Sequence, residues 1–500
     1  MHASSWLGRR RTACVRGVSA APFLVALASG CGADDARNRS GGAHAGALTG
    51  GTGGVASRGG TGGSPAQAGV GAGAVGGTAV VGVPSAGNAG ASQGSGCVTT
   101  LSGVVTTPAG TLPLYDVMLY VPTEALAALR EGVSCDTCEG VVSGAPVASA
   151  LSDEQGRFVM EGVPTGTDVP LVVQIGKWRR EVKVPSVVAC RDNPVDPELT
   201  RLPKSKTEGH LPRIALSTGG LDALECLLLK IGIAKSEFTT PDEDGRVNLF
   251  AGRGGSDQYA DSVDFGAIFP LPDLSLWGDE ATLSPYDVVL LSCEGGEYLL
   301  NKPAEARQRM ADYANRGGRV FFSHYHKLWL EQGPAPFPDV MSFNDTLDDL
   351  RVDASVDTSF PKGQALASWL VNVEGSTTPG IVSLVDAQNT GRTENPLYAQ
   401  RWVYDPFDSA TMSPSVKYMT ANTPLGAPDG EQCGRIVYSD IHVTTDEPNG
   451  DQSAVDLHFP EGCRTTTLSP QEKVLIFMLF DLSGCVIPDH VVPTKPPVVR

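Results

Sequence analysis

The 500-residue sequence contains no run of 18 consecutive apolar residues and few basic residues for its length. The first absence excludes a membrane-spanning helix, which needs about 20 apolar residues. The formal charge is −18, and residues 97–500 alone carry −23 because the first 96 residues carry +5. A nucleic-acid-binding protein needs clustered Lys and Arg to neutralise phosphates, so we expect no nucleic-acid partner for the acidic region 97–500.

Acidic and aromatic residues are absent from residues 41–96, where Arg58 is the one charged residue. The same stretch holds 21 of the 59 glycines. Gly, Ala and Ser bury too little apolar surface to offset the entropy of ordering a chain. We therefore predict a Gly/Ala-rich disordered linker over residues 31–96, with a mean reach on the order of 40–50 Å.

The N-terminus has the features of an export signal. Four arginines between residues 9 and 16 precede a short apolar run at 18–28, which ends in Leu27-Ala28-Ser29-Gly30-Cys31. This order is typical of a secretory signal peptide. Small residues before a cysteine resemble a bacterial lipobox, which implies a lipoprotein signal peptide over 1–30 and lipidation of Cys31. The alternative is an ordinary signal peptide cleaved near Ala28. Gly32 favours the outer membrane or cell surface, so the membrane is an expected partner through the lipid anchor.

Nine further cysteines follow Cys31, and an exported protein is expected to pair them, leaving one over. Cys97 and Cys190 bracket the first domain. Cys135 and Cys138 form a CxxC motif between glycines, and this loop context favours a structural disulfide over a thioredoxin-like redox site or a zinc knuckle. The disulfide candidates are Cys97, Cys190, Cys135, Cys138, Cys226, Cys293, Cys433 and Cys463.

Residues 97–203 show short alternating strands between turn signals, which predicts a small antiparallel β-sandwich. The stretch resembles the carboxypeptidase regulatory-like (transthyretin-like) domain, with matches at Gly103, Asp153, Gly156, Phe158, Val163, Pro164 and Gly166. The resemblance implies a structural or recognition module without catalysis.

Residues 211–487 have continuous apolar strands at 213–217, 286–292, 319–323 and 434–439, with helical periodicity between them. Such strands predict an α/β doubly wound (flavodoxin-like) domain, whose parallel sheet has helices on both faces. Residues 488–500 are rich in Pro and Val and are expected to be a loose tail.

The second domain resembles the class I glutamine amidotransferase-like fold, and more closely its ThuA-like branch. The resemblance lies in YDVVLL (286–291), GGRVFFSHYH (317–326) and GRIVYSDIH (434–442), and a long middle segment stays unmatched. Amidotransferases place a nucleophilic Cys directly after the strand equivalent to 320–323, where this chain has His324. Cys293 follows the preceding strand, and a buried thiol or a disulfide with Cys226 is favoured over catalysis. The resemblance thus implies a domain without its nucleophile.

Histidines are the candidate site residues. His324 and His326 are two apart, and in an extended segment they would share a face at the carboxyl end of a strand. ThuA-like proteins resemble this chain in placing histidines at His324 and His442, and Asp440 and Glu294 are candidates to join them. Such a set suits zinc or another divalent ion. The alternative is that hydrogen-bonded histidines line a turn.

Two functions follow. The favoured one is a cell-envelope lipoprotein with a binding or structural role. The alternative is a metal-dependent hydrolase that uses His324, His326 and His442 on carbohydrate or peptidoglycan-type substrates. Carbohydrate or another envelope component is then the expected partner, because Phe321, Phe322, Tyr325 and Trp329 offer rings that stack on a sugar or, alternatively, pack in the core.

Overall fold

The computed structural model describes residues 97–136, 138, 140, 142–260, 268–344, 350–408, 411–443 and 449–499. These residues belong to one compact unit. The predicted signal peptide (1–30), the lipidation site Cys31 and the predicted linker (31–96) lie outside the described residues.

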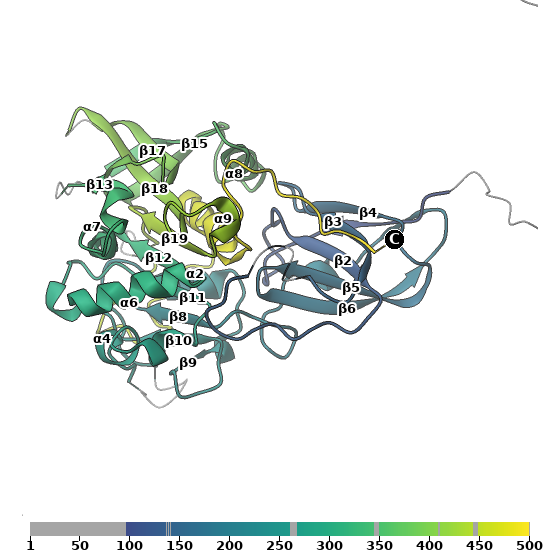
Figure 1. Ribbon diagram of the computed structural model, residues 1–500, viewed down its shortest axis with the longest axis horizontal. Coiled ribbons are helices and arrows are strands. Elements are labelled where there is room, and N and C mark those ends of the chain that lie inside the picture. Colours follow the sequence, from purple (N-terminus) through teal and green to yellow (C-terminus); the bar gives the residue numbers. More distant parts are fainter. Residues whose placement is uncertain are drawn as a thin grey trace, which may run out of the picture. The chain divides into compact units, whose positions relative to one another are not determined.

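Two small sheets form the N-terminal part as a β-sandwich (Figure 1). The three-stranded sheet has the order β4-β1-β7, and the four-stranded sheet has the order β3-β2-β5-β6. Leu101 and Phe158 of the first sheet share one core with Leu119 and Leu171 of the second. The strands are β1 (Thr100–Val104), β2 (Met118–Pro122), β3 (Pro146–Leu151), β4 (Arg157–Glu161), β5 (Gly166–Ile175), β6 (Trp178–Val187) and β7 (Asp192–Pro194).

The structure explains why glycine and aspartate occupy the positions that carry the resemblance in this region. Gly103 faces Phe158 on the neighbouring strand, and a Cβ at Gly103 would lie 2.9 Å from the Phe158 ring. Gly156 has φ +70°, a conformation that glycine adopts without steric cost. The Asp153 carboxylate accepts hydrogen bonds from the backbone N–H groups of Gln155 and Arg157, which fixes the turn. The motif therefore encodes a turn and a close strand contact.

A ten-stranded mixed sheet forms the second part, in the order β15-β14-β17-β18-β19-β12-β11-β8-β10-β9. The six strands from β19 to β9 are parallel, and the remaining four join them as antiparallel neighbours. The parallel strands are β8 (Ile214–Ser217), β9 (Phe238–Thr239), β10 (Val247–Phe250), β11 (Val288–Leu291), β12 (Arg319–Ser323) and β19 (Gly434–Ser439). The antiparallel strands are β14 (Leu350–Val356), β15 (Ile381–Ala387), β17 (Gln400–Asp408) and β18 (Ser413–Thr423). They come from the middle segment that the resemblance leaves unmatched.

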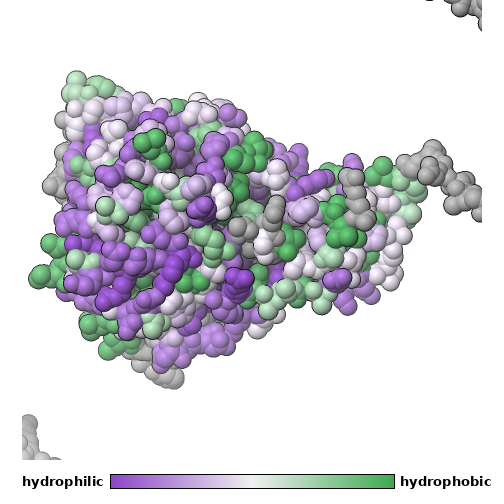
Figure 2. All heavy atoms as spheres, in the orientation of Figure 1, coloured by the Kyte–Doolittle hydropathy of each residue, from purple (hydrophilic) through white to green (hydrophobic). Residues whose placement is uncertain are grey.

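Helices cover both faces of the parallel strands. Alternate strand residues such as Leu216 and Leu290 pack with α2 and α9, whereas Ala215 and Leu291 pack with α6 on the other side. Figure 2 shows a hydrophilic surface over α6, as expected for a helix with one buried stripe. The helices are α1 (Pro197–Thr200), α2 (Leu224–Lys230), α4 (Pro272–Ser275), α5 (Glu280–Leu283), α6 (Ala304–Asn315), α7 (Leu328–Glu331), α8 (Pro361–Asn372) and α9 (Pro470–Ser483). Shorter elements are η1 (Lys235–Glu237), η2 (Leu299–Asn301), η3 (His324–Lys327), η4 (Phe337–Asp339), η5 (Asp429–Glu431) and the pair β13 (Met341–Phe343) and β16 (Gly391–Glu394).

Four disulfides join distant parts of the chain: Cys97–Cys190, Cys135–Cys433, Cys138–Cys485 and Cys226–Cys463. The first follows the bracket seen in the sequence. Both CxxC cysteines form disulfides, as the loop context favours, and each bonds to a cysteine of the second part. A Cys226–Cys293 bond is wrong, because Cys226 faces the loop of Cys463. Cys293 is the free cysteine of the described residues, and Cys485, which is not among the candidates, is paired.

This density of disulfides indicates an exported protein, since such bonds persist in oxidising compartments. Within the described ranges, no helix has both the length and the apolar content that crossing a bilayer requires.

The C-terminal segment is not the loose tail that its composition suggests. The Asn422 side chain donates to the carbonyl of Ile487, and Arg435 pairs with Asp489 at 2.5 Å. Farther along, the Val499 N–H donates to the carbonyl of Pro146 at the start of β3. In Figure 1 this segment is yellow and runs from α9 to β3.

The Cys135–Cys433 and Cys138–Cys485 disulfides close nearly the same loop, with sequence separations of 298 and 347 residues. Replacing either pair by serine leaves the other to restrict the unfolded chain, so we expect a loss below about 1 kcal/mol in the free energy of unfolding. Replacing both pairs is expected to cost about 4 kcal/mol. Urea unfolding measures these losses. Removal of the Cys97–Cys190 pair is the control, and its loss in the free energy of unfolding is expected to add to that of either other pair. Equal, additive losses for the two pairs would contradict the expectation.

Candidate functional site

The candidate site lies where the parallel strands β8, β11, β12 and β19 end. The carboxyl ends of parallel strands share one edge of a sheet, and open α/β sheets bind ligands at this edge. β8 lies between β10 and β11, so the chain proceeds outward from β8 in both directions. The residues that follow these strands include Gly219, Cys293, His324 and His442.

Three side chains from three loops converge here. Cys293, His324 and His442 place their ligating atoms within 4.8 Å of one another. The Cys293 sulfur is 3.6 Å from Nδ1 of His324, and the two imidazole rings lie 5.4 Å apart between centroids. The residues are 0%, 2% and 4% exposed, so the cluster is closed to bulk solvent. The structure therefore brings His324 and His442 together, as the resemblance implies, and adds the thiol of Cys293, which is not among the metal ligands expected from the sequence.

His326 does not join this cluster. Its Nε2 donates to the carbonyl of Ser292 at 3.0 Å, and its Nδ1 accepts a hydrogen bond from the Trp329 indole at 3.0 Å. The expectation of a shared face is wrong because the chain turns after β12 into the 3-10 helix η3. His324 itself has φ +35°, which re-aims the backbone at that point.

Asp440 and Glu294 also have other partners. The carboxylate of Asp440 accepts hydrogen bonds from the Tyr438 hydroxyl at 2.7 Å and the Gly391 N–H at 2.8 Å. Burial raises the pKa of Asp440, although the charges of Lys417 and His442 oppose the rise. Glu294 forms a buried ion pair with Lys302 and accepts a hydrogen bond from the Arg253 N–H. Both carboxylates thus support the loops around the cluster.

Asp222 is a further buried residue of this site, and it is not among the site residues expected from the sequence. Its carboxylate accepts hydrogen bonds from the Ser323 hydroxyl at 2.6 Å and the Val443 N–H at 2.9 Å. The backbone N–H of Cys293 is a third donor. One side chain therefore binds the end of β12 and the loops after β11 and β19 to its own loop after β8. A carboxylate two residues after Gly219-Gly220, at a strand end, is the signal that points to it.

Burial sets the protonation of the cluster. Burial raises the pKa of the Cys293 thiol to about 12, although the backbone N–H groups of Tyr325 and Gly295 lower it. Burial lowers the pKa of His324 to about 3, with the nearby charge of Lys327 acting in the same direction. At neutral pH the site therefore holds a protonated thiol and a neutral imidazole. Nε2 of His324 is 2.9 Å from the Thr390 hydroxyl, which leaves Nδ1 facing the sulfur.

The aromatic residues near the histidines split between two locations. Phe321, Phe322 and Trp329 are at most 3% exposed and belong to the core, which favours packing over sugar stacking. Tyr325 is partly buried and lies against His324, with ring centroids 4.2 Å apart.

A cleft opens at the same edge of the sheet. Its space is about 700 Å³ when the solvent-open part is counted. Glu294 borders it, one residue from Cys293, together with Arg253, Asp273, Trp277 and Asn301. Gly219, in the loop after β8, packs on the loop after β11, and a Cβ at Gly219 would lie 2.3 Å from the carbonyl oxygen of Cys293. The contact between these two loops is so close that it requires glycine.

No protein-family model matches the chain, and no curated protein matches it. Among solved structures, a type II cohesin–X-dockerin complex from Acetivibrio cellulolyticus, with a C-terminal interface mutation, matches at a TM-score of 0.15. The identity is 18% over 30% of this chain and 79% of that chain. An N-terminal interface mutant of the same complex matches at 0.14, with 16% identity over 29% of this chain and 78% of that one. A 9R-lipoxygenase from Cyanothece PCC8801 matches at 0.11, with 10% identity over 71% and 43% of the two chains. TM-scores this low carry no argument about fold or function.

Removal of the Asp222 carboxylate tests its place in the site. Asp222→Ala leaves three buried donors without an acceptor, so we expect a loss of about 3 kcal/mol in the free energy of unfolding. Chemical denaturation measures the loss. Asp339→Ala, at an exposed position, is the matched control and is expected to change stability by less than about 0.5 kcal/mol. Similar losses for the two variants would contradict this role.

Proposed function

We propose that this protein is a lipid-anchored cell-envelope protein with a binding or structural role, whose α/β domain holds a divalent metal ion where amidotransferases hold their nucleophile. The observation that carries the proposal is the convergence of Cys293, His324 and His442 within 4.8 Å at the carboxyl edge of the sheet. A thiolate and two imidazoles are a donor set that suits zinc and other transition metals.

The strand order supports an amidotransferase-like, flavodoxin-like domain. Numbered along the chain without the short β9, the strands β10, β8, β11, β12 and β19 read 2-1-3-4-5, which is the flavodoxin-like order. The residue after β12 has a positive φ, as expected for an elbow at that position, but the residue is His324. The backbone at this position thus supports an amidotransferase-like elbow, while a histidine replaces the amidotransferase cysteine, as the ThuA-like resemblance implies.

The buried environment suits a bound metal better than a free nucleophile. An isolated thiol with a pKa near 12 is protonated and unreactive at neutral pH. A bound cation favours the thiolate, so metal binding is coupled to release of the thiol proton. The imidazole of His324 is already neutral and needs no deprotonation to act as a ligand. When bound, the metal would supply positive charge to a site flanked by Asp222 and Asp440.

The location follows from the N-terminal features together with the disulfides. The lipobox-like segment before Cys31 supports a lipid anchor, and Gly32 supports placement at the outer membrane or cell surface. The predicted linker 31–96 would hold the folded part away from that membrane. The transthyretin-like sandwich would then serve as a structural or recognition module toward carbohydrate or another envelope component.

A metal-dependent hydrolase acting on carbohydrate or peptidoglycan-type substrates is the second candidate. The cleft bordered by Glu294 favours it, because the cleft lies at the same sheet edge as the cluster. The closed state of the three candidate ligands favours the binding role instead, since a hydrolytic metal keeps one position open to water and substrate. Metal-dependent release of fragments from peptidoglycan, lost in His442→Ala, would decide for the hydrolase.

Metal analysis tests the site. Protein purified without chelators is expected to contain about one equivalent of a divalent transition metal, and a His324→Ala, His442→Ala variant is expected to contain less than about a tenth of that. Elemental mass spectrometry measures the content. His490→Ala, at an exposed position outside the cluster, is the matched control and should keep its metal. Equal metal content in all three proteins would end the proposal.

Membrane partition tests the anchor. Cys31→Ser removes the thiol that carries the lipid, so the protein is expected to move from the membrane fraction to the soluble fraction. Fractionation with immunodetection measures the shift, and Cys14→Ser, within the predicted signal peptide, serves as the control. Unchanged membrane association of Cys31→Ser would refute lipid anchoring.

A further inference from the structure

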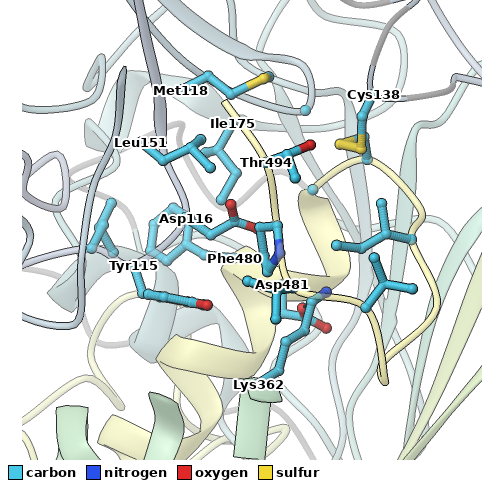
Figure 3. A pocket seen from close by; sticks show the side chains of 18 of the residues that line it. Tyr115, Asp116, Met118, Cys138, Leu151, Ile175, Lys362, Phe480, Asp481 and Thr494 are labelled. Carbon is cyan, nitrogen blue, oxygen red and sulfur yellow. A yellow bond between two sulfur atoms is a disulfide. The ribbon is translucent and has the colours of Figure 1, made fainter. Parts of the chain in front are cut away.

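A second cavity, away from the sheet edge, lies between the sandwich and helices α8 and α9. Figure 3 shows its lining side chains. Its space is about 840 Å³ when the solvent-open part is counted. Most of the lining is apolar: Leu114, Met118, Leu151 and Ile175 come from the sandwich, Trp369, Phe477 and Phe480 from the two helices, and Val491, Val492 and Pro493 from the C-terminal segment.

The charged groups of this cavity do not balance. Lys362 forms an ion pair with Asp481 at 2.6 Å, and Asp481 also pairs with Arg435 at 2.8 Å. Asp116 lines the same cavity and is partly buried, and it forms no ion pair with the described residues. In Figure 3 it lies among apolar side chains, with Asp481 and Lys362 lower in the view. Lys362 is therefore committed to Asp481, and Asp116 leaves one negative charge uncompensated.

Burial makes this charge costly. Burial raises the pKa of Asp116 to about 7, although the charge of Lys362 opposes the rise. A carboxylate in an apolar cavity is stabilised by a proton or by a cation. Aromatic rings favour a cation with an organic body. Tyr115 stacks on Phe477 with centroids 5.8 Å apart, and Trp369 meets Phe477 edge-on at 5.4 Å.

We propose that this cavity binds a small organic cation, an amine or quaternary ammonium with an apolar or aromatic body, whose charge lies at Asp116. An anionic ligand would meet the uncompensated carboxylate, and Lys362, the one cationic side chain among the described lining residues, is already paired with Asp481. A purely apolar ligand would leave that carboxylate buried without a partner. Charge and lining together therefore select an amphiphilic cation.

Three probes of one shape separate these ligand classes: phenethylamine (cationic), phenethyl alcohol (neutral) and 3-phenylpropionate (anionic). Isothermal titration calorimetry on the full-length protein at pH 8 is expected to show the amine binding at least tenfold more tightly than the alcohol, and no binding of 3-phenylpropionate. Asp116→Asn should weaken amine binding at least tenfold and change alcohol binding less than twofold. Asp339→Asn, an exposed matched control, should change neither.

Acidification provides a second readout. The affinity for benzyltrimethylammonium, whose charge does not depend on pH, is expected to fall between pH 8 and pH 6, because Asp116 gains a proton in this range. The pKa of Tyr115 is raised and that of Asp481 is lowered, so both groups keep their charge state, and Lys362 stays paired with Asp481. The same titration on Asp116→Asn should be flat.

Three outcomes would overturn the proposal: no binding of the amine, tighter binding of 3-phenylpropionate than of the amine, or unchanged amine binding in Asp116→Asn. If that variant does not fold, the ranking of the three probes and the pH dependence of the wild-type protein carry the test. Met118→Trp fills the cavity and is expected to abolish binding of every probe, which locates the site. None of these results depends on the metal content of the Cys293 cluster.

Discussion

The buried carboxylate of Asp222 is the constraint on which the candidate site depends. The end of β12 and the loops that follow β11 and β19 meet at its two oxygens, through Ser323, Cys293 and Val443. Burial raises the pKa of Asp222, so its charge is costly, and the three donors offset that cost. A loop that lost this contact would move either the thiol or His442. The convergence of the cluster is therefore a consequence of how one acceptor is satisfied.

A second set of buried contacts fixes the sandwich against the sheet. Lys177, at the turn between β5 and β6, donates to Asp287 at 2.6 Å and to the carbonyl of Gly132 at 2.7 Å. Gly132 lies in the connection between β2 and β3, which also carries Cys135 and Cys138, both bonded to cysteines of the second part. A buried ammonium and two covalent links thus hold this connection in place. This matters for the cavity at Asp116, because its walls come from both parts and keep their spacing only if the parts stay docked.

The sequence predicts four adjacent strands of the parallel sheet, β8, β11, β12 and β19. It predicts neither the four antiparallel strands of the middle segment nor the connections between elements. The strand expected at 319–323 is β12, because a run of apolar residues is a local property of the sequence. The disulfide partners of Cys135 and Cys138 lie 298 and 347 positions away in the chain, so no local pattern reveals them. The expectation that His326 shares a face with His324 is wrong for another reason. It requires an extended chain, but the strand has already ended at His324, where φ is positive. Cys293 lies beside His324 and His442 in space but far from both in the sequence, so its place in the cluster follows from the fold and not from a local pattern.

Helix α9 is the element that the two proposed sites share. Near its start, the Gln471 side chain donates to the carbonyl of His442 and accepts a hydrogen bond from the Val385 N–H. Near its end, Phe477, Phe480 and Asp481 line the cavity. The helix has a capping box at Ser469 and Glu472, and 11 of its 14 residues are buried. A capped helix packed on most sides moves as a unit if it moves at all. The backbone of His442 and one wall of the cavity are therefore positioned by the same helix.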